Sequence, residues 1–266
     1  MAERVLLEIE DGIATVTLNR PDKYNGLDMP MFDAIAKTAR QLQKDRDVRV
    51  VILKGAGEAF CSGLDVKTVS RNPLNFARLL MKPGRKIANL AQEMGYLWRE
   101  VPAPVIAVTH GYCFGGGLQI ALGADFRYTT PDCEFSIMES KWGLIPDMSL
   151  MTTLPGLMAM DQAKRLAMTA ERVDGHKARE LGLVTEVTED PEAAARAFAE
   201  ELKARSPDAI AGIKLLFNRA WKADDKTALD WETKLQQKII ARWNQRAAIS
   251  QNTSDEPKPY RSRRKF

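Results

Sequence analysis

Short apolar runs separated by a polar turn open the chain. β-Branched and other apolar residues fill positions 5–9 and 13–18, and Asp11-Gly12 lies between the two runs. Apolar stretches on either side of Asp-Gly are typical of a β-hairpin. The N-terminal segment therefore predicts two antiparallel strands.

Two later apolar runs, residues 48–53 and 105–108, show little alternation of polar and apolar positions. Such runs predict strands that are buried on both faces. A helix is predicted before the first run, from Asp28 as its cap to about Lys44, and another over residues 85–99 before the second run. Strands that alternate with helices indicate a layered α/β core.

Residues 67–84 fit neither the helical nor the strand period. Asn72-Pro73 and Lys82-Pro83-Gly84 interrupt the pattern there, and such residues commonly mark loops. We expect an irregular, mobile surface segment that is suited to act as a lid over a site.

The second half of the chain changes from mixed elements to helices alone. From Asp190 onward only helical spacing is seen, and the last helix is predicted over residues 226–246. Before that point, short strands are expected at residues 125–129, 134–137 and 183–187. We therefore divide the chain into a sheet-bearing core over residues 1–200 and a helical subdomain over residues 201–266.

Composition narrows the class of protein without identifying it. The 266 residues are 45% hydrophobic, and no apolar run approaches the roughly 20 residues that span a bilayer. The net charge of 39 − 35 = +4 is too small to indicate nucleic acid by itself. For the basic cluster at residues 261–265, a solvated tail and a contact with a polyanion or another subunit both remain open.

Cysteine and histidine usage argues against a metal site. The three cysteines lack metal-ligand spacing, and only two histidines are present. The odd number of cysteines favours free thiols in a reducing compartment. The first four residues lead directly into a predicted strand, so no signal peptide is seen in the pattern. We expect a cytoplasmic protein with no metal, no membrane contact and no nucleic-acid partner.

The most informative motif is the triple glycine at residues 115–117. It follows the apolar run at residues 105–108 and opens a short helix. The start of a helix carries unpaired N–H groups and a partial positive charge, and glycine lets a ligand approach them closely. The motif suits a phosphate, a carboxylate or a developing oxyanion. Residues 59–65 form a second glycine-containing turn after a buried strand.

The residues at these two turns resemble the crotonase superfamily, also called the enoyl-CoA hydratase/isomerase family. The resemblance covers almost the whole chain. It implies an α/β fold built as a crotonase-like spiral of ββα units, with a helical C-terminal subdomain that forms trimers. It rests on several motifs in family-like order and spacing: Asn19-Arg20-Pro21, Ser62-Gly63-Leu64-Asp65, the triple glycine, Gly143-Leu144-Ile145-Pro146 and residues 174–184.

The resemblance also implies an acyl-CoA site. In the family, two backbone N–H groups form an oxyanion hole around the thioester oxygen, and the matching positions here are Ser62 and Gly116. No cofactor is expected beyond the CoA moiety of the substrate. The residues expected to contact CoA are Lys23, Ser62, Gly63, Leu64, Asp65 and Gly116.

The acid–base positions leave the reaction open. Typical hydratases carry two carboxylates, and the resemblance places one at Glu139 but Gln119 at the other position. An amide cannot exchange a proton at neutral pH. Asp147 is a further candidate acid, because dienoyl-CoA isomerases of the family have an Asp there; a helix cap is its structural alternative.

One carboxylate is enough to move a double bond, because it can remove a proton from one carbon and return it to another. We therefore expect isomerisation slightly ahead of hydration, on an acyl-CoA substrate, in a homotrimer or hexamer. A non-catalytic CoA- or RNA-binding homologue and another crotonase reaction, such as dienoyl-CoA isomerisation, decarboxylation or dehalogenation, remain alternatives.

Overall fold

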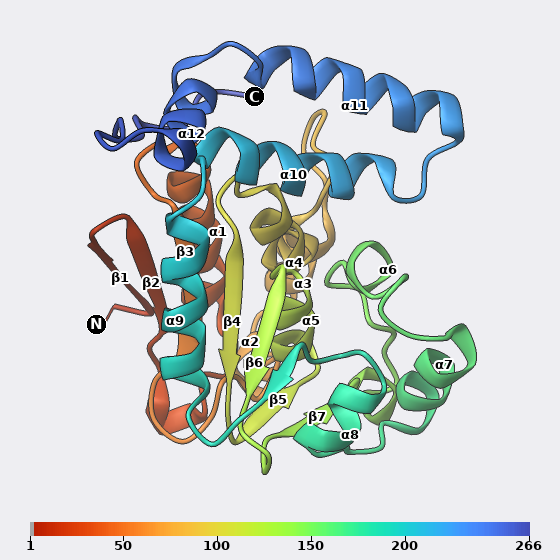
Figure 1. The fold of residues 1–266 in the computed structure, drawn as a ribbon. Coiled ribbons are helices and arrows are strands. Elements are labelled where there is room, and N and C mark those ends of the chain that lie inside the picture. Colours follow the sequence, from red (N-terminus) through yellow and green to blue (C-terminus); the bar gives the residue numbers. More distant parts are fainter. Residues whose placement is uncertain (1–2) are drawn as a thin grey trace.

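A six-stranded sheet forms the centre of the molecule in the computed structural model, which describes residues 3–266 (Figure 1). The predicted hairpin is confirmed, since β1 (Val5–Glu10) pairs antiparallel with β2 (Ile13–Leu18). All further pairs in this sheet are parallel. The sheet continues with β3 (Val50–Gly55), β4 (Val105–Thr109), β6 (Phe126–Thr129) and β8 (Glu186–Val187).

Helices cover both faces of the sheet, as the apolar runs predict. In β3, Val51 and Leu53 belong to the larger core, which includes α1 (Met29–Lys44) and α4 (Leu90–Glu100). Val50 and Ile52 belong to a second core that is closed by α9 (Pro191–Lys203). Figure 1 shows α9 in front of the sheet and α1 and α4 behind it. The predicted boundary at residue 200 falls inside α9.

Helix starts follow their capping residues. The Asp28 carboxylate accepts a hydrogen bond from the Met31 N–H, which confirms it as the cap of α1. The predicted helix over residues 85–99 starts later, because Asn89 and Gln92 form a reciprocal capping box at its N-terminus. The structure assigns residues 85–88 to the segment before the helix.

The prediction of an irregular segment over residues 67–84 is wrong in part. The segment contains α2 (Val66–Val69) and α3 (Pro73–Leu80). The Asn72 side chain accepts from the Leu74 N–H, so Asn72-Pro73 starts a helix instead of interrupting one. Proline is tolerated in the first helical turn because its missing N–H has no partner there in any case.

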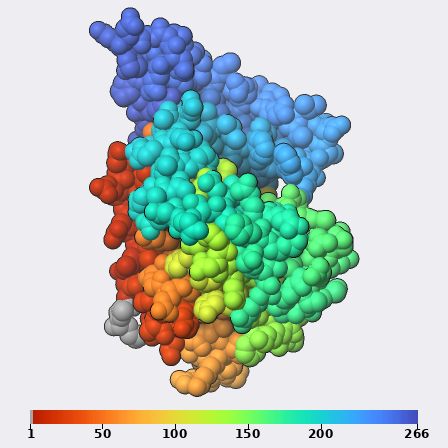
Figure 2. All heavy atoms as spheres, turned by 60° about the horizontal axis from the view of Figure 1, so that its bottom comes forward, coloured from red at the N-terminus to blue at the C-terminus, as the bar shows by residue number. Residues whose placement is uncertain are grey.

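The C-terminal helices lie at one end of the sheet. They are α10 (Pro207–Ala220), α11 (Asp225–Ile239) and α12 (Trp243–Thr253). The single helix predicted over residues 226–246 is therefore two helices, and Ala241 between them has a φ of +59°. Figure 2 shows the blue part of the chain, which contains α11 and α12, projecting beyond the rest of the molecule. No helix among residues 3–266 combines the length and the apolar character that a membrane crossing needs.

The segment after α12 packs against the residues that follow α1. The Arg263 N–H donates to Arg46 O at 2.9 Å, and its guanidinium donates to Asp45 O at 2.6 Å. Arg263 is only 4% exposed. At this position the basic cluster is docked against the end of α1.

Candidate active site

The two predicted glycine turns lie against each other. The Cys61 N–H donates to Tyr112 O at 2.9 Å, and the Phe114 N–H donates to Cys61 O at 3.0 Å. This pairing joins the turn at residues 61–65 to β5 (Tyr112–Phe114), which leads into α5 (Gly116–Leu122). Gly63 has a φ of +91°, and a Cβ there would lie 3.5 Å from the Gly116 nitrogen. The turn is therefore packed on the start of α5.

Gly115 and Gly117 of the triplet avoid two different steric clashes. Gly115 has a φ of +48°, and a Cβ there would lie 3.4 Å from Glu139 Oε1. A Cβ at Gly117 would lie 2.7 Å from Cys61 Cβ and closer still to the Cys61 carbonyl oxygen. The triplet thus brings the carboxylate of Glu139 and the turn at residue 61 to opposite sides of one helix start.

Some backbone N–H groups at the two glycine turns donate hydrogen bonds within the protein, and others do not. The Ser62 N–H donates to Tyr24 O at 2.9 Å, so the prediction of Ser62 as an oxyanion donor is wrong. Two residues further on, the Leu64 N–H has no hydrogen-bond acceptor among residues 3–266. The Gly116 N–H is also without an acceptor in that part of the chain, as expected of the first residue in a helix.

Contacts with Leu27 explain why Leu64 keeps its free amide. The Leu27 N–H donates to Gly63 O at 2.8 Å, and the Asp65 N–H donates to Leu27 O at 3.0 Å. In this parallel bridge the amide between the two bonded groups points away from the partner segment. The available donors next to the helix start are therefore Leu64 and Gly116.

Glu139 is the first residue of the 3₁₀ turn η2 (Glu139–Trp142), which follows β7 (Glu134–Ser136). Its Oε1 accepts from Gln119 Nε2 at 2.6 Å. Its Oε2 is buried and has no hydrogen-bond partner among residues 3–266. Burial raises the pKa of Glu139, the hydrogen bond from Gln119 opposes that rise, and the charge of Asp147 adds to it.

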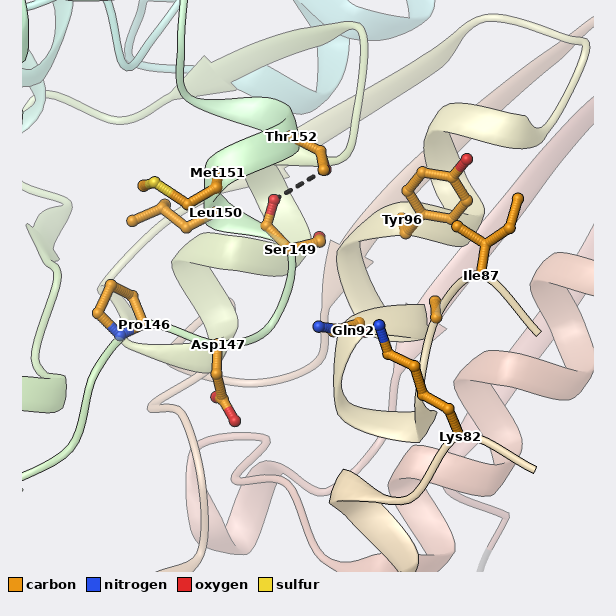
Figure 3. A pocket seen from close by; sticks show the side chains of 11 residues that line it. Lys82, Ile87, Gln92, Tyr96, Pro146, Asp147, Ser149, Leu150, Met151 and Thr152 are labelled. Carbon is orange, nitrogen blue, oxygen red and sulfur yellow. Dashed lines mark hydrogen bonds between the residues drawn. The ribbon is translucent and has the colours of Figure 1, made fainter. Parts of the chain in front are cut away.

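Asp147 lines a cavity of about 230 Å³. It approaches from the segment before α6 (Leu150–Thr153), while Gln92 and Tyr96 approach from α4 and Lys82 from the segment after α3 (Figure 3). Burial raises the pKa of Asp147 as well. Polar groups thus stand on both sides of a largely apolar hollow, next to the segment that carries Met148.

The residues expected to contact CoA do not all have free polar groups. Lys23 is exposed, and its side chain has no hydrogen-bond or ion-pair partner among residues 3–266. Its carbonyl oxygen accepts from Ser62 Oγ at 3.4 Å, which places Lys23 beside the turn. The Asp65 carboxylate, in contrast, accepts from Arg20 at 2.9 Å and from Thr68 at 2.8 Å. Its charge is therefore already used within the protein.

Asp65 has an accordingly shifted pKa. Burial raises the pKa of this carboxyl group, but the hydrogen bonds from Thr68 and Arg20 outweigh burial and hold the pKa below its ordinary value. Asp65 also caps α2. These contacts give it a structural task in the turn that carries Leu64.

Sequence reasoning did not identify Gly95 and Met148. A Cβ at Gly95 of α4 would lie 2.6 Å from Gln119 O and 3.0 Å from Met148 O. A glycine inside an otherwise regular helix was the available signal, since glycine there costs stability unless packing requires it. Met148 gave no such signal, because its part in the site is its backbone N–H, which donates to Gln119 Oε1 at 2.9 Å.

A larger hollow, of about 700 Å³, lies between α10 and the core. None of the predicted site residues lines it. It contains the buried amine of Lys214, which pairs with Asp125 at 2.6 Å and donates to two carbonyl oxygens at 3.1 Å. The Lys214 amine therefore has all its hydrogen bonds within the protein, as is typical of a structural ion pair.

Comparison with known proteins identifies the family. A family model described as enoyl-CoA hydratase/isomerase matches residues 8–255. The chain belongs to this family. The expected membership of the crotonase superfamily and the α/β fold are thereby confirmed, and the protein is an enzyme of the enoyl-CoA hydratase/isomerase type.

Named relatives include both isomerases and hydratases. The peroxisomal Delta(3,5)-Delta(2,4)-dienoyl-CoA isomerase of Arabidopsis thaliana is 30% identical over 255 residues, which cover 92% of this chain and 88% of that protein. The short-chain-enoyl-CoA hydratase of Clostridium acetobutylicum is 31% identical over 232 residues, which cover 86% of each. The crystal structure of enoyl-CoA hydratase from Mycobacterium tuberculosis H37Rv superposes with a TM-score of 0.84 at 28% identity, covering 97% of this chain and 98% of that one.

Proposed function

We propose that the protein isomerises the double bond of an enoyl-CoA, with Glu139 as its proton-transfer group. The observation that carries the proposal is the state of Glu139: one carboxylate oxygen is held by Gln119, and the other is buried and unpaired among residues 3–266. A buried carboxylate with a raised pKa is suited both to take a proton and to return it.

The reaction balances without water. The Glu139 carboxylate removes a proton from the α-carbon of a 3-enoyl-CoA, and the electron pair of that C–H bond moves into an enolate. Glu139 then returns the proton to the γ-carbon, and the double bond comes to lie between the α- and β-carbons. The charge that develops on the thioester oxygen is stabilised by two backbone donors, for which we propose Leu64 and Gly116; such donors contribute about 3–4 kcal/mol each in well-studied enzymes.

The free amine of Lys23 supports a contact with the phosphates of CoA.

Asp147 supports a second reaction of the same type, the isomerisation of a dienoyl-CoA. Asp147 lines the cavity and the pKa of its carboxyl group is raised, so this group could exchange a proton with a more distant carbon of a dienoyl chain. Hydration stays the next candidate. The homotrimeric or hexameric state and the cytoplasmic location stay predictions.

The decisive experiment compares Glu139→Gln with wild type on 2-enoyl-, 3-enoyl- and 3,5-dienoyl-CoA, with products separated by mass spectrometry. We expect turnover of the preferred substrate to fall by roughly 10²–10⁴-fold, because proton transfer is lost. CoA-thioester binding should be nearly unchanged, because the carbonyl oxygen of the substituted amide can still accept from Gln119. Glu189→Gln, an exposed position, is the matched control.

Wild-type turnover in Glu139→Gln would eliminate Glu139 as the acid/base. A product that is one water heavier than the substrate would identify hydration. In deuterated water, a single shuttling carboxylate should leave part of the substrate's own hydrogen in the isomerised product, whereas two separate acid–base groups would exchange it fully.

A further inference from the structure

Gln119 is held at both ends of its amide, although an amide takes no part in proton exchange. Its Oε1 accepts from the Met148 N–H at 2.9 Å, and its Nε2 donates to Glu139 Oε1 at 2.6 Å. A backbone N–H can only donate, so the carbonyl end of the amide must face Met148. The NH₂ end then faces Glu139, and the fold fixes the orientation of the amide.

This orientation makes the two oxygens of Glu139 inequivalent. An NH₂ group offers a proton and accepts none, so Oε1 always faces a donor. Oε2 is buried without a partner among residues 3–266. A proton taken from a substrate can therefore be held on Oε2 while the bond between Gln119 and Oε1 stays intact.

The support for Gln119 reaches back to α4. Gln119 is 1% exposed. A Cβ at Gly95 would lie 2.6 Å from the backbone carbonyl oxygen of Gln119, so the backbone of Gln119 is packed against α4. Through Met148 it is tied to the segment that carries Asp147 into the cavity. One side chain thus connects the Glu139 turn with the segment that carries Asp147.

We infer that Gln119 is a positioning residue, which grips Glu139 by Oε1, presents Oε2 as the oxygen that carries the proton, and fixes the distance between Glu139 and the Asp147 segment. This inference rests on the proposed role of Glu139. On this view, the glutamine that replaces the second hydratase carboxylate is a working part of a single-carboxylate enzyme.

Other charges around Glu139 are few. Asp147 is the ionisable neighbour whose charge acts on it. The 3₁₀ turn itself carries Lys141, and α7 (Met160–Thr169) packs against that turn. The charged residues of both elements are exposed to solvent: Lys141, Asp161, Lys164 and Arg165.

Two substitutions distinguish the hydrogen bond from Gln119 to Glu139 from the hydrogen bond that Gln119 accepts from the Met148 N–H. Gln119→Met keeps the approximate volume and removes both hydrogen bonds. Gln119→Glu keeps an acceptor for the Met148 N–H but places a carboxylate beside Glu139. Gln236→Met, at an exposed position of α11, is the matched control. The measurements are kcat, KM and the pH profile of kcat/KM, with circular dichroism to verify folding.

In Gln119→Met we expect kcat to fall much more than KM changes, and the acid limb of kcat/KM to move up by roughly 1–2 pH units, because the ionised base has lost its donor. In Gln119→Glu the limb should move further, since two carboxylates in contact do not both ionise readily. If both folded variants keep the wild-type kcat and acid limb while Glu139→Gln is inactive, the inference is overturned and the proposed function stands. An active Glu139→Gln would instead remove the proposed function itself.

A measurement on the unmodified Gln119 covers the case in which its variants fail to fold. In protein labelled with ¹⁵N-glutamine, one side-chain amide signal should titrate with the midpoint of the acid limb of kcat/KM, and this titration should vanish in Glu139→Gln. A glutamine spectrum without any pH-dependent amide signal that is sensitive to this substitution would overturn the inference.

Discussion

Gly95→Ala tests how tightly α4 supports the site. The added Cβ would lie 2.6 Å from Gln119 O and 3.0 Å from Met148 O, and it would also contact Ser149 Oγ. Alanine favours a helix interior over glycine by about 1 kcal/mol. Overpacking costs about 1–3 kcal/mol, and here it falls on two backbone carbonyls that cannot rotate away. The contact should therefore win over helix propensity.

Two fixed carbonyls place the overpacking cost in the upper part of that range, about 2–3 kcal/mol, so after the gain in helix propensity we expect a net loss of about 1–2 kcal/mol and a fall in Tm of roughly 2–8 °C at fixed protein concentration. Because Gln119 and Met148 are the displaced neighbours, kcat should fall as well. The assay is thermal denaturation together with turnover of the preferred enoyl-CoA, on Gly95→Ala and on Gly95→Ala/Ser149→Ala.

The double variant identifies the decisive contact. It removes Ser149 Oγ but leaves both carbonyl contacts, so stability and turnover should stay low. Full recovery in the double variant would show that the hydroxyl alone was the obstacle. A single variant that is as stable as wild type would refute the reasoning, since helix propensity would then outweigh the contact.

Three further predictions address stability, pH and CoA binding. Lys214→Met should cost roughly 2–4 kcal/mol in chemical denaturation, because it leaves the carboxylate of Asp125 in a largely buried place without its cation; an unchanged midpoint would contradict this. The pKa of Asp147 is higher in the folded state than in the unfolded state. The folded protein therefore loses stability as the pH rises from the pKa of the unfolded state through the pKa of the folded state. Asp147→Asn should therefore stabilise the protein at pH 7 and not at about pH 3, and a larger gain in acid would refute it. Lys23→Ala should weaken CoA binding about two- to fivefold at low salt and less at high salt, whereas Lys226→Ala on α11 should not; a salt-independent effect would argue against a phosphate contact.

Much of the fold follows from local patterns. Asp11-Gly12 predicts the hairpin, Asp28 predicts the start of α1, and the apolar run in β3 predicts helices on both faces of the sheet. These features depend on neighbours a few residues apart, and a sequence displays such neighbours directly. Asn72-Pro73 shows the limit, because the same pair can end one pattern or cap a new helix.

The site depended on contacts that no local pattern contains. The sequence suggested Ser62 as an oxyanion donor, because nothing in residues 59–65 reveals that the Ser62 N–H donates to Tyr24 O. The role of Gln119 depends likewise on a backbone N–H 29 positions later. Glu139 could be proposed from its motif, but the unpaired state of Oε2 could be seen only in the folded chain.

The docked segment around Arg263 bears on the order in which the molecule is completed. The Arg46 guanidinium donates to Arg263 O at 2.6 Å across 217 positions of sequence, so the end of α1 is closed by a segment that is synthesised long after it. During synthesis the N-terminal part of a chain is available for folding before the C-terminal part. In a nascent chain the carbonyl groups of Asp45 and Arg46, which directly follow α1, should therefore stay hydrated until the segment around Arg263 has been made, so the docking of this segment is a late step of folding.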